Sequence, residues 1–172
     1  MNSEHEKISD ILKTLLLGLT NFHSQLSMEA REVGDVGLSL KISTQHSDCG
    51  KVVGSQGKNI KALKAIFRAI SHTGGAIYNI ILEEPHDYQL LEGKEVNECW
   101  QIPKYRNLIE SICERLTRFP VTVDSSESTE CLTLMVVFSQ PATVPEEVKS
   151  GLDTIFKGIG KNHGIRIEVV TN

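Results

Sequence analysis

Residues 48–60 read Asp-Cys-Gly-Lys-Val-Val-Gly-Ser-Gln-Gly-Lys-Asn-Ile, so two glycines, Gly54 and Gly57, flank two polar residues. A Gly-x-x-Gly stretch lets the backbone turn tightly and lets a phosphate chain approach it closely. The stretch leads directly into a segment with the apolar spacing of a helix, whose N-terminal N–H groups favour an anion. It therefore predicts a phosphate-binding loop.

Three better-known phosphate-binding motifs do not fit this stretch. A Walker P-loop needs glycine at position 52 and serine or threonine at position 59, where the chain has Val52 and Asn59. A dinucleotide fingerprint also needs glycine at position 52. A cysteine-based phosphatase loop starting at Cys49 would want arginine where Ser55 stands. A Gly-x-x-Gly turn between two helices remains.

The elements around the loop follow from hydrophobic periodicity. Apolar residues recur at helical spacing in residues 6–20, and residues 26–31 and 36–43 alternate around a Gly/Asp turn. A helix is expected at about 58–72, and a strand at 77–82. The first half of the chain thus has the order helix, strand, strand, short helix, helix, strand.

The same order returns in the second half, except for the short helix. Expected there are a helix over 104–118, a strand starting at Val121, an alternating strand over 132–138, a helix over 145–158 and a last strand over 165–169. Apolar strand positions repeat at an offset of 96 (Leu40 onto Val136), whereas helix positions repeat at 89 (Gly75 onto Gly164). The pattern indicates an internal duplication that lacks seven residues of the Gly-bearing stretch.

Residues 6–84 resemble a type II KH domain, most closely the small bacterial KH proteins of the KhpA type. The likeness lies in residues 50–58 (Gly-Lys-Val-Val-Gly-Ser-Gln-Gly-Lys) within the order α-β-β-α-α-β. It implies non-catalytic binding of single-stranded nucleic acid, mostly RNA, whose backbone the loop clamps over about four nucleotides. Gly54, Ser55, Gln56 and Gly57 would form the clamp, and an apolar floor under the bases would be made by Val52, Val53 and Ile60.

The chain departs from the family at Ser55, where lysine or arginine is often found, so one phosphate contact would be either lost or supplied by Lys51 or Lys58. The second copy has no Gly-x-x-Gly, and Glu146 and Glu147 start its helix. The resemblance thus implies an α+β protein of two tandem KH-like units, the second degenerate. The expected organisation is a KH domain over 1–84, an acidic linker over 85–103 and a KH-like domain over 104–172. We expect the second unit to pack against the first.

Charge supports the resemblance independently. The whole chain has a net charge of −4, but residues 41–72 carry six basic residues and one acid, hence +5, and the rest carries 12 basic and 21 acidic residues, hence −9. At 100° per residue, one face of the helix after the loop is apolar and the opposite face is basic. The basic face comprises Lys58, Lys61, Lys64 and Arg68. A merely solvated face would usually mix signs, so this face predicts contact with phosphates.

The acidic segment 84–103 is expected to be a bridge pinned onto the body by apolar side chains. Its acids, together with the preceding Glu83, are Glu84, Asp87, Glu92, Glu95 and Glu98, and its candidate anchors are Tyr88, Leu90, Leu91 and Trp100. Trp100 and Tyr105 could instead stack on bases. Anchoring is the favoured interpretation.

Other functional classes find little support. The four cysteines form no CxxC pair, the six histidines show no metal-ligand spacing, and no cofactor motif occurs. His46, Asp48 and Cys49 are neighbours in sequence, but they lack an orienting group and an oxyanion site, and we expect exposed loop residues. The sequence predicts no enzyme. It also predicts no membrane span and no signal peptide, hence a cytoplasmic protein.

The predicted function is non-catalytic binding of single-stranded RNA, or of single-stranded DNA, through the clamp and the basic helix face. The alternative is an assembly or regulatory factor that binds a protein on a KH-like scaffold. A protein partner could also bind through the second unit, whose expected role is otherwise structural.

Overall fold

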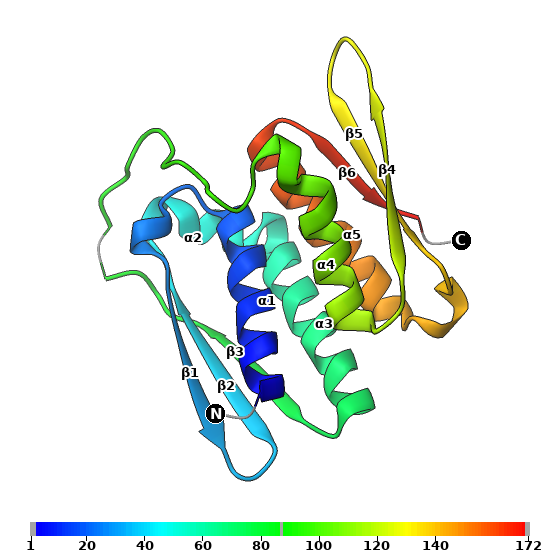
Figure 1. Cartoon of the computed structure of the whole chain (residues 1–172). Coiled ribbons are helices and arrows are strands. Elements are labelled where there is room, and N and C mark those ends of the chain that lie inside the picture. The colour runs from blue at the N-terminus through cyan, green and yellow to red at the C-terminus, as the bar shows by residue number, and fades with distance from the viewer. Residues whose placement is uncertain (1–2, 87, 171–172) are drawn as a thin grey trace.

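Two three-stranded sheets lie on the outer sides of the helices, in the computed structural model of residues 3–86 and 88–170 (Figure 1). The longer helices are α1 (Ser3–Leu19), α3 (Lys58–Gly74), α4 (Tyr105–Thr117) and α5 (Glu146–His163), and α2 (His46–Val53) is short. The strands are β1 (Ser27–Val33), β2 (Gly37–Ser43), β3 (Ile77–Leu82), β4 (Val121–Glu127), β5 (Leu132–Phe138) and β6 (Arg166–Val169). Single 3₁₀ turns occur at His23–Gln25, Ser55–Gly57, Ile102–Lys104 and Pro141–Thr143. The predicted α+β class is confirmed.

Both sheets have the same construction. In each, the first strand pairs antiparallel with the second, and the second pairs parallel with the third. Leu40 pairs with Ile80 in the first sheet, and Val136 pairs with Val169 in the second. Offsets of 96 and 89 carry the first pair onto the second. The two halves therefore share their strand register as well as their order of elements.

The two helices that precede the third strands, α3 and α5, also end alike. Gly75 ends α3 with φ 71°, and Gly164 ends α5 with φ 70°. The backbone therefore leaves each helix through the left-handed region that glycine adopts most easily. These glycines are the pair that the offset of 89 aligns. In place of α2 and its loop, the second half has only the Pro141–Thr143 turn.

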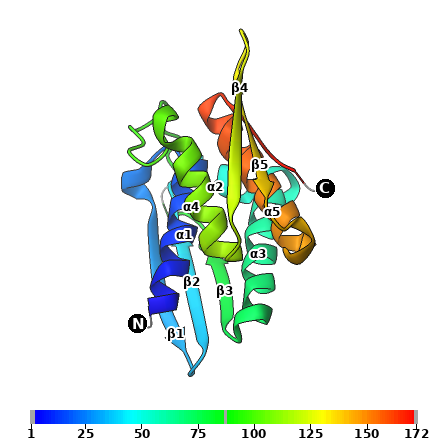
Figure 2. The same ribbon diagram turned by 45° about the vertical axis from the view of Figure 1, so that its right-hand side comes forward.

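The halves pack against each other through helices, as expected. Helices α3 and α5 run antiparallel in the middle of the molecule, and α1 also contacts α5 (Figures 1 and 2). At Gly151 of α5 the backbones come very close, since an added Cβ would lie 2.6 Å from Ile66 Cγ1 and 3.2 Å from the Ala62 carbonyl oxygen. One cluster of buried apolar side chains spans both halves.

The bridge between the halves is irregular, and several of its side chains tie it to the first half. Trp100 is 2% exposed, and its indole N–H donates to the Thr14 carbonyl of α1 at 2.8 Å. Asn97 donates to the Leu17 carbonyl at 2.8 Å. Leu90 is 72% exposed, so it was wrongly predicted as an anchor, whereas Tyr88, although 66% exposed, packs its ring edge-on against His46 of α2. The predicted acid Asp87 lies outside the described residues.

Candidate nucleic-acid interface

The Gly-x-x-Gly loop joins α2 to α3 and owes its shape to positive φ angles. Gly54 has φ 76° and Gly57 has φ 74°, values that residues with a Cβ rarely adopt. Gln56 between them has φ 55° and is, with Arg118, one of two non-glycine residues with positive φ in the described part of the chain. Such conformations cost energy and concentrate at functional sites. The predicted tight turn is present.

Asn59 holds the two helices together at the loop. Its side-chain amide donates to the Lys51 carbonyl of α2 at 2.8 Å. A Cβ on Gly54 would lie 2.7 Å from Asn59 Cγ, so the loop closes directly over this side chain. No side chain caps the N-terminus of α3. The Lys58 N–H donates to the Ser55 carbonyl, and the positive end of the helix dipole still favours an anion at this terminus.

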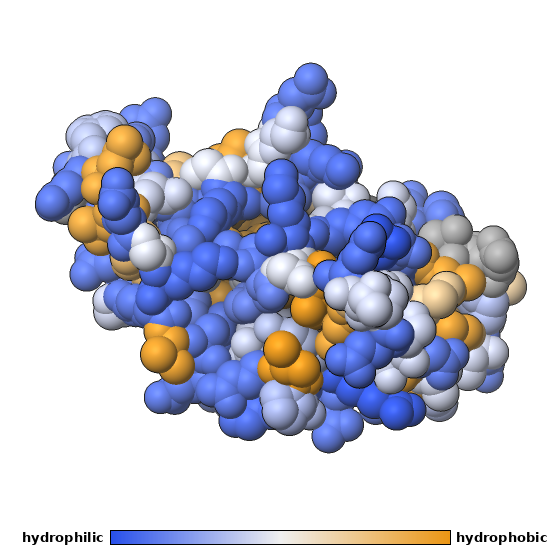
Figure 3. All heavy atoms as spheres, turned by 90° about the horizontal axis from the view of Figure 1, so that it is seen from above, coloured by the Kyte–Doolittle hydropathy of each residue, from blue (hydrophilic) through white to orange (hydrophobic). Residues whose placement is uncertain are grey.

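The basic face of α3 (Lys58, Lys61, Lys64 and Arg68) lies in solvent, as predicted. None of its four cations forms an ion pair with any residue that the structure describes. Lys61 reaches back to the loop, where its ammonium donates to the Gln56 carbonyl at 3.3 Å. The end of the molecule that carries the loop is mostly hydrophilic, with apolar residues in separate patches (Figure 3). Unpaired cations beside a tight loop are suited to a phosphate backbone.

The predicted apolar floor is wrong at one residue. Val52 is fully buried, so a base cannot touch it, and it belongs to the core between α2 and the rest of the first half. An eight-residue helix is too short for its burial to be read from periodicity. Val53 and Ile60 are half-buried and keep some surface at the loop. Lys51 is also half-buried and lies beside the loop.

The neighbours His46, Asp48 and Cys49 are not exposed loop residues but part of α2. Asp48 is 1% exposed, and its carboxylate accepts the backbone N–H groups of Asn21 at 2.9 Å and Phe22 at 2.7 Å. The Asp48 carboxylate thus fixes the end of α1 against α2. Trp100 and Tyr105 are both buried, so base stacking by these two rings is excluded in this conformation.

Beside the loop lies a cleft of about 600 Å³ that the sequence did not predict. The loop and the first turn of α3 form one wall, the last turns of α5 form another, and Lys94 of the bridge closes it. The residues that sequence reasoning missed are Asn59, Lys94, Thr154, Lys157, Lys161 and Asn162. Lys157 and Lys161 are one helical turn apart on α5, but only the packing of α5 against α3 brings them to the loop.

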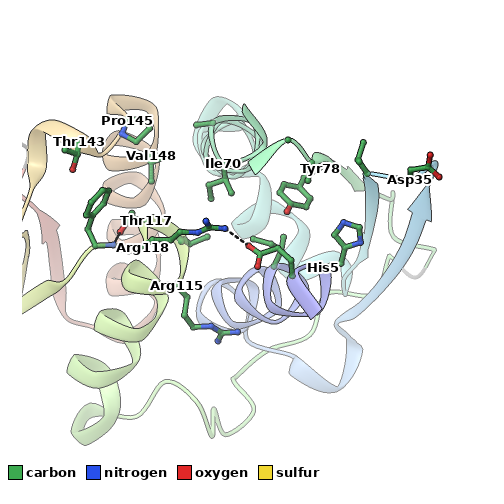
Figure 4. A pocket seen from close by; sticks show the side chains of 18 residues that line it. His5, Asp35, Ile70, Tyr78, Arg115, Thr117, Arg118, Thr143, Pro145 and Val148 are labelled. Carbon is green, nitrogen blue, oxygen red and sulfur yellow. Dashed lines mark hydrogen bonds and ion pairs between the residues drawn. The ribbon is translucent and has the colours of Figure 1, made fainter. Parts of the chain in front are cut away.

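A second cleft, of about 630 Å³, opens at the opposite end of α3 and also lies between the halves (Figure 4). Here Arg118, directly after α4, forms an ion pair with Glu4 of α1 at 3.3 Å. His5 contacts Glu32 at 3.3 Å. Acids and bases are mixed in this cleft and partly neutralise each other. It therefore fits a polyanion less well than the cleft at the loop.

His163, at the end of α5, should contribute to the loss of stability of the fold at acidic pH. Its ring packs against Trp100 and Tyr105, and its Nε2 lies 3.0 Å from the Gly18 carbonyl oxygen. Burial lowers the pKa of His163 below its usual value near 6.5, and although the hydrogen bond with the Gly18 carbonyl raises it, the charges of Lys94, His23 and Lys51 lower it further. The unfolded chain thus binds this proton first as the pH falls, so the free energy of unfolding decreases below about pH 6.5.

We expect His163→Gln to lose less stability between pH 7.5 and 5.5 than the native chain does. Urea midpoints at the two pH values measure the difference, and glutamine can still donate to the Gly18 carbonyl. The exposed His86→Gln is the matched control and should follow the native chain. Equal losses in His163→Gln and the native chain would contradict the prediction.

No known protein family matches the chain, and no curated protein is significantly similar to it in sequence. Among the described residues, no three or more His, Cys, Asp or Glu side chains are grouped so that they could hold a metal ion. Across the same residues, no helix combines the length and the apolar character that crossing a bilayer requires.

Proposed function

We propose that the chain binds single-stranded RNA without catalysis, through the loop Gly54–Gly57 and the basic face of α3. The observation that carries this proposal is the loop itself. Two glycines with positive φ turn the backbone onto the N-terminus of α3, which no side chain caps. Lys58 and Lys61, which form no ion pair with any described residue, follow that turn. Together, these features suit a phosphate backbone and do not provide a nucleophile or a general base.

The architecture supports the KH interpretation of the site. The first half has the order α-β-β-α-α-β that a type II KH unit requires, and the loop falls between its second and third helices. The second half repeats the sheet but lacks the loop. We propose two KH-like units, the first of which binds and the second of which has lost the clamp. A non-enzymatic role and a cytoplasmic location stay predictions from the sequence.

Salt dependence is the test of this function. A clamp that neutralises about four phosphates of a single strand should give a slope near −3 in a plot of log affinity against log salt. Raising the salt from 50 to 200 mM should then weaken binding about 50-fold. Fluorescence anisotropy of a labelled four-nucleotide single-stranded RNA measures this, with duplex RNA and matched single-stranded DNA as comparisons.

The duplex should bind more weakly than the single strand, because its stacked bases cannot be spread over a tight loop. The ratio of the affinities for single-stranded RNA and single-stranded DNA identifies which of the two is the preferred ligand. Absence of salt-dependent binding to any single strand would overturn the proposal and would favour the alternative, a protein partner on the same scaffold.

A further inference from the structure

The cleft beside the loop gathers cations from three distant stretches of the chain. Its walls include Lys51 and Lys58 of the first half, Lys94 of the bridge and Lys157 and Lys161 of the second half. None of the residues that line it is an acid. Five lysines around about 600 Å³ without an acid in the lining give a strongly positive surface, although the chain as a whole is negative.

Asn162, near the end of α5, brings two of these lysines together. The Lys51 ammonium donates to Asn162 Oδ1 at 3.2 Å, and the Lys94 ammonium donates to the Asn162 carbonyl. Partial burial lowers the pKa of Lys51, and the charge of Lys94 acts in the same direction, against the attraction of Asp48. The two cations thus lie close enough to repel each other, and an anion placed between them would relieve that repulsion.

The carboxylates near the cleft neutralise only part of this charge. Asp48 lies 3.8 Å from Lys51 but is buried beneath it, and Asp153 pairs with Lys157 at 2.7 Å. Lys58, Lys94 and Lys161 have no carboxylate partner among the described residues. The positive surface therefore continues from the first half onto the bridge and the second half.

This cleft and most of the basic face lie on two different flanks of α3. At 100° per residue, Lys61, Lys64 and Arg68 lie on one flank of α3, and Asn59 lies on the flank that faces α5. Lys58 lies between the two flanks and lines the cleft. A strand that is clamped at the loop has a basic surface on both sides. One side belongs to the first half alone, and the other is shared with α5.

We propose that the bound strand continues past the loop into this cleft, where Lys94, Lys157 and Lys161 contact the phosphates that follow the clamp. The inference rests on the proposed function, and it gives the degenerate second half a direct part in binding. It also lengthens the expected site beyond the four nucleotides of one clamp. A single-stranded RNA backbone is the occupant because its charge matches and its chain already lies at the loop.

The test compares two lengths of single-stranded RNA, four and twelve nucleotides, with the triple variant Lys94→Gln/Lys157→Gln/Lys161→Gln. The matched control is Lys7→Gln/Lys13→Gln/Lys104→Gln, which removes the same charge from exposed residues outside the cleft. Thermal unfolding followed by circular dichroism establishes that both variants are folded. Affinities are measured by anisotropy at several salt concentrations.

For the twelve-nucleotide strand, we expect the cleft variant to bind at least about tenfold more weakly than the control and its salt slope to be smaller by about two. For the four-nucleotide strand, the cleft variant and the control should agree within about twofold. Cleft-variant affinity equal to the control's for the long strand would overturn the inference while leaving the clamp intact. Equal loss for both lengths would also overturn it, since the lysines would then act at the clamp itself. If the native chain binds neither strand, the proposed function fails first, and the extended path fails with it.

Discussion

The double variant Ser55→Asp/Gln56→Asp should bind single-stranded RNA about 30-fold more weakly than the native chain. Each new carboxylate would lie next to the bound phosphates, and a unit charge about 4 Å from another costs about 1 kcal/mol in water. Two such charges cost about 2 kcal/mol, and 1.4 kcal/mol corresponds to tenfold. Anisotropy titration at fixed salt measures the loss.

The loop should keep its shape in this variant. Ser55 and Gln56 are exposed, and aspartate tolerates the positive φ that Gln56 adopts. Ser55→Asn/Gln56→Asn is the matched control, because asparagine has nearly the same shape, tolerates the same φ and carries no charge. If the Asp and Asn variants bind RNA equally well, the loop does not touch phosphate and the clamp interpretation is wrong.

Trp100→Ala should lower the free energy of unfolding by about 3–5 kcal/mol, the usual cost of truncating a buried tryptophan. The indole is 2% exposed, packs against Tyr105 and His163, and lies so close to Gly18 that an added Cβ there would be 2.8 Å away. The change removes this packing and the hydrogen bond from the indole to the Thr14 carbonyl. Urea unfolding followed by circular dichroism measures it.

Leu90→Ala is the control for Trp100→Ala. It truncates an apolar side chain of the same bridge that is 72% exposed, so its effect should stay within about 0.5 kcal/mol. A loss in Trp100→Ala no larger than that in Leu90→Ala would show that the bridge is not held by its tryptophan.

The elements of the fold were largely predictable, because each helix or strand buries one face. Its apolar residues therefore recur in the sequence at the period of that helix or strand. Residues 77–82 and 132–138 were placed at the observed ends of β3 and β5. The last helix was predicted to stop near Gly158, yet α5 continues to His163. Gly158 and Gly160 do not end it. They lie where a Cβ would be 3.0 Å from Leu19 Cδ2 and 2.6 Å from the Ile165 carbonyl oxygen.

The site was predictable only where it is local. The loop and the basic face of α3 follow one another in the chain, so spacing and charge were enough to find Gly54 and Lys58. Val52 was misplaced because it was assigned by family resemblance, and its burial depends on packing that eight residues do not reveal. Lys94 and Lys161 carry no local signal at all. Their position follows from the contact between α3 and α5, which joins distant stretches of sequence.

The covalent fusion of the two halves has a consequence for dilute protein. The contact between α3 and α5 closes within one chain, through the bridge between β3 and α4. A short tether of this kind gives the joined surfaces an effective concentration on the order of millimolar. The halves therefore stay associated at nanomolar protein, where two separate subunits with a weak contact would part. The surface that both halves share around the loop therefore stays intact on dilution. The affinity of that surface for its ligand then does not depend on a prior association of subunits.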